Sequence, residues 1–397
     1  MGFFDDDEVE SGDPRALVVP QCGACGLYAG CKSPYMPVTG KGHRGVLIVA
    51  EAPGRNEDER GVQLIGKAGK ELRSQLDLLG VDLDGDCWKT NAVICRPEDN
   101  KLPPKAIEYC RPNLNKTLDE LQPKVVVLLG APAVESLLGP EWGSSIGKLG
   151  RWVGWRIPLQ SRNMWICPTY HPSYILREGF KPLTTWFRNH LEAAFELDGR
   201  PWKEVPDYKS KVRIEKDPKT AARLIRLMAS KHPEVPIAFD YETDRMKPDH
   251  PEASIYSCSI CWGGDHTLAY PWVGEAIEAT SEVLRSPVRK IGANIKFEQR
   301  WTIAKLGHRV RNWWWDCMQA AHICDCREGI TSVKFQGFVR LGFPYWAGKI
   351  DSFLREKSGN KQNRIRQANL NDLLLYNGLD SITEYHIAMS QRKELGL

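Results

Sequence analysis

The sequence has no apolar run long enough to cross a membrane as a helix. Such a helix needs about 20 consecutive apolar residues, and the longest stretch of that character, residues 125–134, contains Gly130 and Pro132. The first 20 residues also lack the basic start and apolar centre of a secretory signal, because they carry six acidic side chains and one base, Arg15. We therefore expect a soluble protein in which residues 1–20 form an acidic flexible tail.

Cysteine is too sparse for a disulfide scaffold, with 12 cysteines in 397 residues. Basic charge is also modest. The formal net charge is +4, and removing the tail's charge of −5 leaves about +9 for the rest of the chain. A mildly basic body suits a polyanion such as nucleic acid, although charge alone is weak evidence. The spacing of the cysteines is therefore more informative than their number.

The chain is too long for one hydrophobic core, which usually stops growing beyond roughly 150 residues. The segment 198–211 is polar and contains two prolines, and strand-like apolar runs resume at residues 235–239. We place a linker at 198–211, between a first domain at 21–197 and a second at 212–397. No internal repeat relates the two halves.

Both halves alternate strand and helix patterns, which predicts an α/β fold. In the first half, the continuous apolar runs 46–50 and 125–129 predict strands buried on both faces of a parallel sheet. Helical periodicity is found at 67–79, 105–121 and 184–197. In the second half we expect strands at 235–241, 254–262 and 266–270, followed by helices at 294–306, 316–324 and 370–392.

Four cysteines have the spacing of a metal site. Cys22 and Cys25 are separated by two residues, as thiolates on one turn must be to share a metal, and Cys95 and Cys110 offer a second pair. The alternatives are buried thiols or a redox pair, and the redox pair is disfavoured because no strand–helix–strand unit begins there.

Four sequence blocks in the first half follow one another in a fixed order. They are VAEAPGRNED at 49–58, GKAG at 66–69, TNAVICRP at 90–97 and HPSYILR at 171–177. Over roughly residues 20–196, this set resembles the iron–sulfur uracil-DNA glycosylases of the family-4 type. The resemblance implies a three-layer α/β/α fold and a [4Fe–4S] cluster on Cys22, Cys25, Cys95 and Cys110, with Cys31 as a bystander. Spacing alone does not separate such a cluster from zinc.

The resembling blocks also contain side chains suited to cutting an N-glycosidic bond, which leaves negative charge on the departing base. His171 is expected to donate to uracil O2, and the Asn91 amide to read the edge of a flipped base. Glu51 and the following Pro53 and Gly54 are expected to address the sugar, a water and the base. Leu64 stands where the family usually has an aromatic ring, and a lost stacking contact of about 1–3 kcal/mol predicts weakened or altered base selectivity.

The second half contains carboxylates spaced for two divalent ions. Asp240 and Glu242 alternate onto one face of a predicted strand, while Tyr376 and Asp380 lie one helical turn apart. A solvated strand edge would explain the first pair alone. With Glu298, however, the ordered set resembles the proofreading 3′–5′ exonuclease domain of family-A DNA polymerases, the DEDD type with tyrosine. This resemblance implies a ribonuclease-H-like fold with a mixed sheet and helices.

The same resemblance implies how the carboxylates would work. Asp240 would bridge two Mg²⁺ or Mn²⁺ ions, Glu242 and Asp380 would hold the ion that carries the attacking water, and Tyr376 would orient that water. Glu298 stands where the family more often has aspartate, which predicts retuned or reduced activity.

Several other features favour structural roles. Asp316 is expected to cap a helix, and the tryptophans at 313–315 to belong to the core. Cys258 and Cys261 lack a partner pair for zinc. The basic segment 355–366 either contacts phosphates or is solvated.

Together the two halves resemble the front part of certain bacteriophage DNA polymerases. We expect a DNA repair or replication enzyme that combines excision of uracil, or a related base, with metal-dependent 3′–5′ exonucleolysis. It would act on single-stranded or frayed 3′ ends and on uracil-containing DNA, in the cytoplasm of a bacterial cell or a phage-infected host. The alternative is a replisome accessory protein whose first domain only reads DNA and whose exonuclease proofreads for a polymerase in trans.

Overall fold

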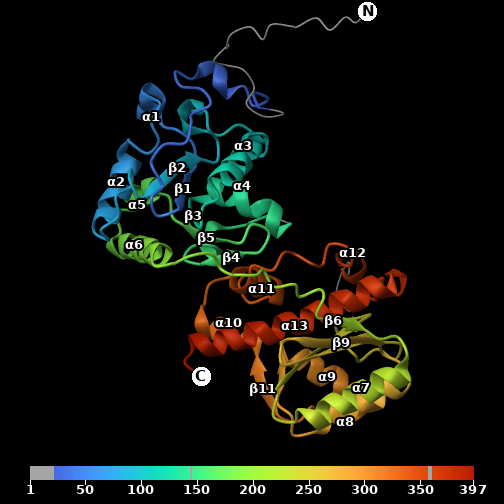
Figure 1. The fold of residues 1–397 in the computed structure, drawn as a ribbon. Coiled ribbons are helices and arrows are strands. Elements are labelled where there is room, and N and C mark those ends of the chain that lie inside the picture. Colours follow the sequence, from blue (N-terminus) through green and yellow to red (C-terminus); the bar gives the residue numbers. More distant parts are fainter. Residues whose placement is uncertain (1–21, 144, 356–359) are drawn as a thin grey trace, which may run out of the picture. The chain divides into compact units, whose positions relative to one another are not determined.

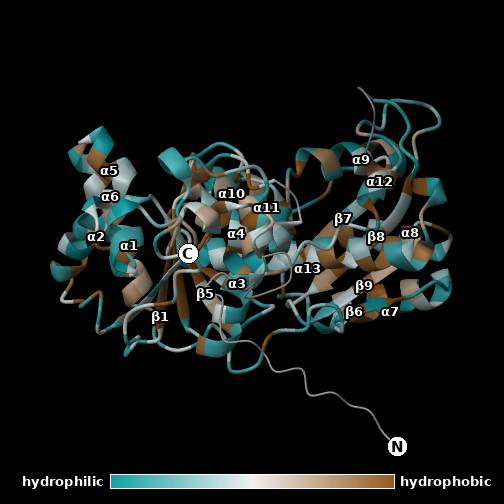
Figure 2. Cartoon of the chain, turned by 90° about the horizontal axis from the view of Figure 1, so that it is seen from above, coloured by the Kyte–Doolittle hydropathy of each residue, from teal (hydrophilic) through white to brown (hydrophobic). Residues whose placement is uncertain are grey.

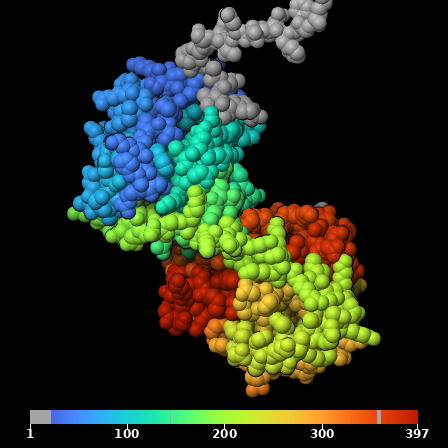
Figure 3. All heavy atoms as spheres, in the orientation of Figure 1, coloured from blue at the N-terminus to red at the C-terminus, as the bar shows by residue number. Residues whose placement is uncertain are grey.

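The computed structural model describes residues 22–143, 145–355 and 360–397, so the acidic tail predicted at 1–20 lies outside the described residues. The chain divides into two compact units, coloured blue to green and yellow-green to red (Figures 1 and 3). The first comprises the described residues up to Arg156, together with Asn163–Pro201. The second comprises Trp202–Leu397 together with the short segment Ile157–Arg162, which interrupts the first unit in the sequence.

The first sheet has the strand order β2-β1-β3-β5-β4, and all of its strands except β4, which falls in the segment Ile157–Arg162, belong to the first unit. β1 pairs in parallel with β2 and β3, and β3 pairs in parallel with β5. The strands are β1 (Val46–Ala50), β2 (Cys87–Asn91), β3 (Val125–Leu129), β4 (Ile157–Leu159) and β5 (Met164–Thr169). The helices are α1 (Arg55–Arg60), α2 (Lys67–Asp77), α3 (Ala106–Leu121), α4 (Ala131–Trp142), α5 (Pro172–Glu178) and α6 (Lys181–Phe195). Short 3₁₀ turns lie at η1 (Leu27–Gly30), η2 (Glu98–Asn100) and η3 (Leu149–Arg151).

Every residue of β1 and β3 is buried, as their uninterrupted apolar sequences predict. Alternate side chains of these strands join one core with apolar residues of α2 and α6, while α4 packs on β1 and β3. Hydrophobic residues accordingly gather in the strands and on the helix faces turned toward them (Figure 2). The predicted three-layer α/β/α fold of the first unit is confirmed.

The second unit has a mixed six-stranded sheet in the order β11-β10-β7-β8-β9-β6. β7 pairs antiparallel with β8, and β8 with β9, while the remaining neighbours are parallel. The strands are β6 (Val212–Ile214), β7 (Ile237–Thr243), β8 (Ile255–Trp262), β9 (His266–Pro271), β10 (Lys290–Gly292) and β11 (Trp313–Asp316). This mixed sheet with helices confirms the predicted class of the second unit.

Helices pack on the second sheet and form two separate hydrophobic cores with it. One core combines α7 (Pro218–Lys231), α8 (Glu275–Arg285) and Trp301 of α9 (Lys296–Leu306) with the strands. The other combines α13 (Leu370–Glu394), Cys317 of α10 (Cys317–Cys324) and Leu341 of α11 (Val333–Leu341) with Ala238 and Ile291 of the sheet. The short α12 (Asp351–Leu354) and η4 (Ile365–Gln367) precede α13. Within the described ranges, no helix combines the length and the apolar character that crossing a membrane requires.

Gly69 of α2 is required by the close approach of the preceding loop. A β-carbon on Gly69 would lie 1.9 Å from the carbonyl oxygen of Leu64, whose own φ is 53°. We therefore predict that Gly69→Ala lowers the free energy of unfolding by about 1–3 kcal/mol, measured by thermal or denaturant unfolding, because backbone atoms must move to admit the methyl group. Gly139→Ala, also within a helix, is the control, because its methyl group meets only the flexible end of Glu135. Equal stability of the two variants would contradict the prediction.

Candidate functional site

The four predicted cluster cysteines line one small pocket in the first unit. Cys22 and Cys25 precede η1, Cys95 follows β2, and Cys110 lies in α3. Apolar and aromatic residues complete the wall, among them Tyr28, Tyr35, Val93 and Ile94. The structure therefore brings together two pairs of cysteines that lie far apart in the sequence.

Hydrogen-bond donors point at the sulfur atoms of this pocket. The backbone N–H of Tyr35 donates to Cys95 Sγ at 3.4 Å, and that of Ile94 to Cys110 Sγ at 3.3 Å. The Asn113 side-chain amide lies 3.6 Å from Cys110 Sγ and 3.9 Å from Cys22 Sγ. Donors aimed at sulfur stabilise thiolate ligands and tune a bound centre, so this environment fits a metal cluster.

Cys31 has the opposite hydrogen-bonding role, because its thiol donates to the carbonyls of Leu27, at 3.2 Å, and of Arg96, at 3.6 Å. To bind a metal as a thiolate, Cys31 would have to give up both of these hydrogen bonds. This geometry supports the prediction that Cys31 is a bystander.

Cys95 and Cys110 need a bound cation if they are to act as thiolate ligands. Burial raises the pKa of Cys95 to about 12 and that of Cys110 to about 11, so bound cations are needed to keep them as thiolates.

His171 is held in the tautomer that the excision role requires. It caps the N-terminus of α5, where its Nδ1 accepts the backbone N–H of Ser173 at 3.2 Å and lies 2.7 Å from the Ser173 hydroxyl. Burial, with a smaller effect of the Arg177 charge, lowers the pKa of His171 to about 4. The ring is therefore neutral near pH 7, and its proton lies on Nε2.

Glu51 directly follows β1, and its electrostatic environment includes the same arginine. Burial raises the pKa of the Glu51 carboxyl group, while the charge of Arg177 opposes that rise. Arg177 also donates to the Ser173 hydroxyl at 3.2 Å. The charge of Arg177 therefore influences the pKa of both Glu51 and His171. Arg177 belongs to the HPSYILR block, but the sequence pattern did not predict this role.

Asn91 is the last residue of β2 and is 2 % exposed. Its amide donates to Gln63 Oε1, and the Gln63 amide in turn donates to the carbonyl of Pro37 at 3.2 Å. Gln63 therefore orients Asn91, a role that the sequence did not predict. Leu64 is 6 % exposed and belongs to the hydrophobic core, so its contact with a base stays a prediction.

A buried carboxylate fixes the loop that carries Gln63 and Leu64. Glu57 Oε1 accepts the backbone N–H groups of Ile65, at 3.0 Å, and Gly66, at 2.6 Å. A β-carbon on Gly54 would lie 2.7 Å from Glu57 Oε2, so Gly54 leaves room for this carboxylate. The Pro53-Gly54 segment and the GKAG block are therefore joined through Glu57.

The second unit brings Asp240 and Glu242 of β7 together with Asp380 of α13. Ligand oxygens of this trio all lie within 4.8 Å of one another. Burial is the main cause that raises the pKa of Asp240, to about 8, and the charge of Asp380 raises it further. Carboxylates held this close repel one another unless cations lie between them, so the donor set fits divalent ions with oxygen ligands.

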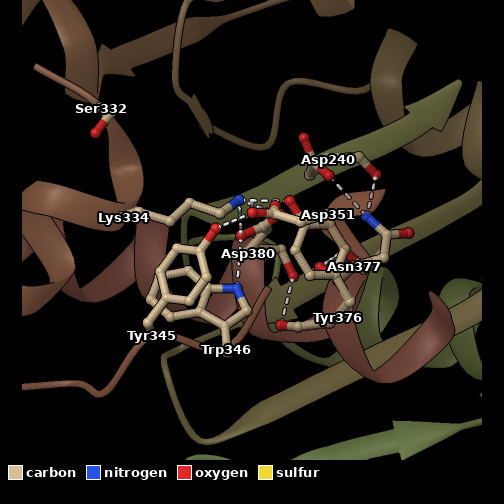
Figure 4. A network of polar contacts seen from close by, with 12 residues as sticks. Asp240, Ser332, Lys334, Tyr345, Trp346, Asp351, Tyr376, Asn377 and Asp380 are labelled. Carbon is tan, nitrogen blue, oxygen red and sulfur yellow. Dashed lines mark hydrogen bonds and ion pairs between the residues drawn. The ribbon is translucent and has the colours of Figure 1, made fainter. Parts of the chain in front are cut away.

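Lys334 of α11 is the cation that the trio already has, and the sequence did not predict its role. Its Nζ lies 2.9 and 3.0 Å from the two carboxylate oxygens of Asp380 and donates to the Tyr376 hydroxyl at 2.5 Å (Figure 4). The Trp346 indole also donates to Asp380, at 2.9 Å. Lys334 donates to the phenol oxygen, and the Tyr376 hydroxyl also forms a hydrogen bond with the Asp380 carboxylate that keeps the phenol protonated. Burial raises the pKa of Tyr376 well above its usual value, so the phenol is neutral.

Asp240 is oriented by Asn377, which lies on α13 between Tyr376 and Asp380. The Asn377 amide donates to Asp240 Oδ2 at 2.7 Å and to the Asp240 carbonyl at 3.3 Å (Figure 4). Glu298, the predicted fourth carboxylate, lies on α9 and is 2 % exposed. It is not part of the close trio, and its Oε2 has no hydrogen-bond partner.

The remaining expectations concern structural roles. Asp316 caps α10 as predicted, accepting the backbone N–H of Met318 at 2.9 Å. The three tryptophans form the half-buried strand β11 and all have partners: Trp313 stacks on Phe239, Trp314 lies beneath Arg289 and Arg392, and Trp315 donates to Gln391. Cys258 and Cys261 are fully buried strand residues.

The described part of the basic segment is tied to the end of β7. The backbone N–H of Asn363 donates to the Asp244 carbonyl at 2.9 Å, and the Gln362 amide donates to the Asp244 carboxylate at 3.2 Å. Arg366 donates to the Tyr256 hydroxyl, so its guanidinium has a protein partner. These contacts hold residues 362–366 beside the strand that carries Asp240 and Glu242.

The geometry defines a chain with a cysteine-lined pocket, a buried Asn91 and a neutral His171 in one α/β unit and a close acidic trio in the other. Family comparison agrees with this division. The model of the uracil DNA glycosylase superfamily matches residues 37–196, and that of a 3′–5′ exonuclease matches residues 212–395.

Comparison with individual relatives identifies the family of the first unit more narrowly. The type-4 uracil-DNA glycosylase of Pyrobaculum aerophilum is 36% identical over 170 residues, covering 41% of this chain and 82% of that protein. That of Archaeoglobus fulgidus is 29% identical over 205 residues, covering 50% of this chain and all of that protein. Through its first unit, the chain belongs to the type-4 uracil-DNA glycosylase family. Among solved structures, Escherichia coli RNase D covers 47% of this chain and 46% of its own, with 14% identity and a TM-score of 0.34.

The cysteine geometry predicts which thiols hold iron. Cys110→Ser should lose most of the bound iron and the broad visible absorbance of a cluster, because one of four thiolate ligands is removed. Cys31→Ser should keep both, because the Cys31 thiol donates to carbonyls. The measurement is iron per chain with a visible spectrum, on protein purified without air. Equal iron content in the two variants would refute this ligand assignment.

Proposed function

We propose that the chain excises uracil, or a closely related base, from DNA with its first unit and hydrolyses DNA from 3′ ends with its second. The observation that carries the first activity is the neutral His171, with its Nε2 proton available, whose electrostatic environment shares Arg177 with that of Glu51. The Asp240, Glu242 and Asp380 trio carries the second. Both units belong to or match families of enzymes, so a non-catalytic accessory role is not favoured.

In the first unit, four side chains would carry out base excision: His171, Asn91, Glu51 and Arg177. As the glycosidic bond breaks, negative charge develops on the base, and the Nε2–H of His171 stabilises it by donating to uracil O2. The Asn91 amide, fixed by Gln63, reads the edge of the extruded base. Glu51 accepts a proton from the water that attacks the sugar. Arg177 adds positive potential on the side where the base departs.

In the second unit, bound divalent cations would neutralise the phosphate and activate water. Asp240, Glu242 and Asp380 supply the oxygen ligands for them. Asn377 holds the Asp240 carboxylate in one orientation, and Trp346 and Lys334 do the same for Asp380. The Tyr376 hydroxyl, which receives a hydrogen bond from Lys334, would orient the attacking water.

The cofactors follow from the donor sets. We propose a [4Fe–4S] cluster on Cys22, Cys25, Cys95 and Cys110, supported by the one pocket that these cysteines line and by the donors that point at their sulfurs. For the oxygen ligands of the second unit we propose two Mg²⁺ or Mn²⁺ ions. DNA is the substrate of both units. A polymerase acting in trans and a cytoplasmic location in a bacterial or phage-infected cell stay proposals, supported by the pairing of these two activities.

Excision should depend on His171 through its neutral form. His171→Gln, which keeps an amide donor but not the imidazole geometry, should slow release of uracil from a single strand by about 100-fold or more. The wild-type rate should fall as the pH drops, first through the raised pKa of Glu51 and then near pH 4 where His171 gains a proton. Single-turnover excision followed by alkaline cleavage measures both effects. A loss of rate that stays centred near pH 6.5 in Glu51→Gln would show instead that an ordinary, unshifted histidine controls the reaction.

Chelation should separate the two activities in one assay. EDTA should abolish nucleotide release from a 3′ overhang but leave uracil excision intact, because excision uses no divalent ion. Asp240→Asn should reproduce the effect of EDTA. His171→Gln serves as the reciprocal control, since it should lose excision and keep exonuclease activity. Exonuclease activity that persists in Asp240→Asn would overturn the assignment of the metal site.

A further inference from the structure

Glu384 is a carboxylate of the second unit that neither the sequence motifs nor the family match assigns. It lies one helical turn beyond Asp380 on α13, so both side chains point from the same face of the helix. Glu384 is 3 % exposed. Its Oε2 is buried and has no hydrogen-bond partner. A buried carboxylate oxygen without a partner is costly, and such cases need an explanation.

Glu298 has the same unusual property on α9. It is 2 % exposed, and its Oε2 also lacks a hydrogen-bond partner. The charge of Asp240 raises the pKa of both glutamates, and the charge of Glu298 raises that of Glu384 further. The two glutamates and Asp240 are therefore coupled electrostatically, although both glutamates lie outside the close trio of ligand oxygens.

The buried acids of this region have little compensating positive charge. Lys334 is the one cation whose effect on them is resolved within the described residues, and the acids are Asp240, Glu242, Glu298, Asp380 and Glu384. One ammonium group offsets one negative charge, so these buried carboxylates favour the binding of further cations.

We propose that Glu384 is a fifth metal-site carboxylate, which together with Glu298 and Asp240 holds the second divalent ion, directly or through a water. The longer Glu298 side chain and the added Glu384 then act as a pair in place of the shorter aspartate of the family pattern. This inference rests on the proposed exonuclease function and concerns only the second of its two ions.

The test counts bound Mn²⁺ on the full-length protein by electron paramagnetic resonance. The wild type should bind two ions. Glu384→Gln should keep the tighter ion at wild-type affinity and bind the other at least about tenfold more weakly. Glu298→Gln should show the same selective loss. Glu394→Gln, on the same helix but at an exposed acid paired with Arg340, is the matched control and should bind both ions normally.

Stability provides a second readout that a purely structural role would not produce. Without metal, Glu384→Gln should unfold at or above the wild-type temperature, because a buried acid is replaced by a neutral isostere. The rise in unfolding temperature on adding Mn²⁺ should be smaller than in the wild type, since one ion no longer binds the folded state tightly. If Glu384→Gln does not fold, Glu384→Asp keeps the charge and should selectively weaken the second ion.

The outcomes separate this inference from the proposed function. Full binding of both ions by Glu384→Gln, with loss of both in Asp240→Asn, would refute the role of Glu384 and leave the exonuclease site standing. Two ions still bound in Asp240→Asn would refute the metal site itself. Selective loss of one ion in both glutamine variants, with normal binding by Glu394→Gln, supports the inference.

Discussion

Burial of the central strands decides where chemistry can occur in this chain. β1 is buried along its whole length and contains no polar side chain, so the first unit can place acids only beyond its end, at Glu51 and Glu57. β7 follows a similar rule, because its first three residues are apolar and its acids come in the second half of the strand. Each site therefore lies at the carboxyl end of a strand that the hydrophobic core holds rigidly.

The two units solve the problem of buried charge differently. In the first unit, backbone N–H groups stabilise a buried carboxylate. Glu57 accepts those of Ile65 and Gly66 and needs no cation. The second concentrates carboxylates around Lys334, which can offset only part of their charge. A site of the first kind is complete as protein alone, whereas a site of the second kind becomes stable as ions bind.

Sequence patterns predicted the parts of this structure that depend on local spacing. The strands at 46–50 and 125–129 follow directly from their uninterrupted apolar runs, and the long helix that begins at Leu370 was also expected. The Asp240 and Glu242 pair and the distant Asp380 were found because motif residues keep fixed intervals. Lys334, Gln63 and Glu384 were missed because lysine, glutamine and glutamate on a helix or loop usually face solvent. Tertiary packing alone buries these side chains, and no local sequence pattern indicates it.

The six-residue helix α1 joins two regions that the sequence separates. Asp58 accepts the backbone N–H groups of Lys32 and Ser33, in the loop after the first two cluster cysteines, while the adjacent Glu57 holds the loop that orients Asn91 through Gln63. Movement of the cysteine loop would therefore shift the base-reading loop through α1, which would make the cysteines a structural support for base excision.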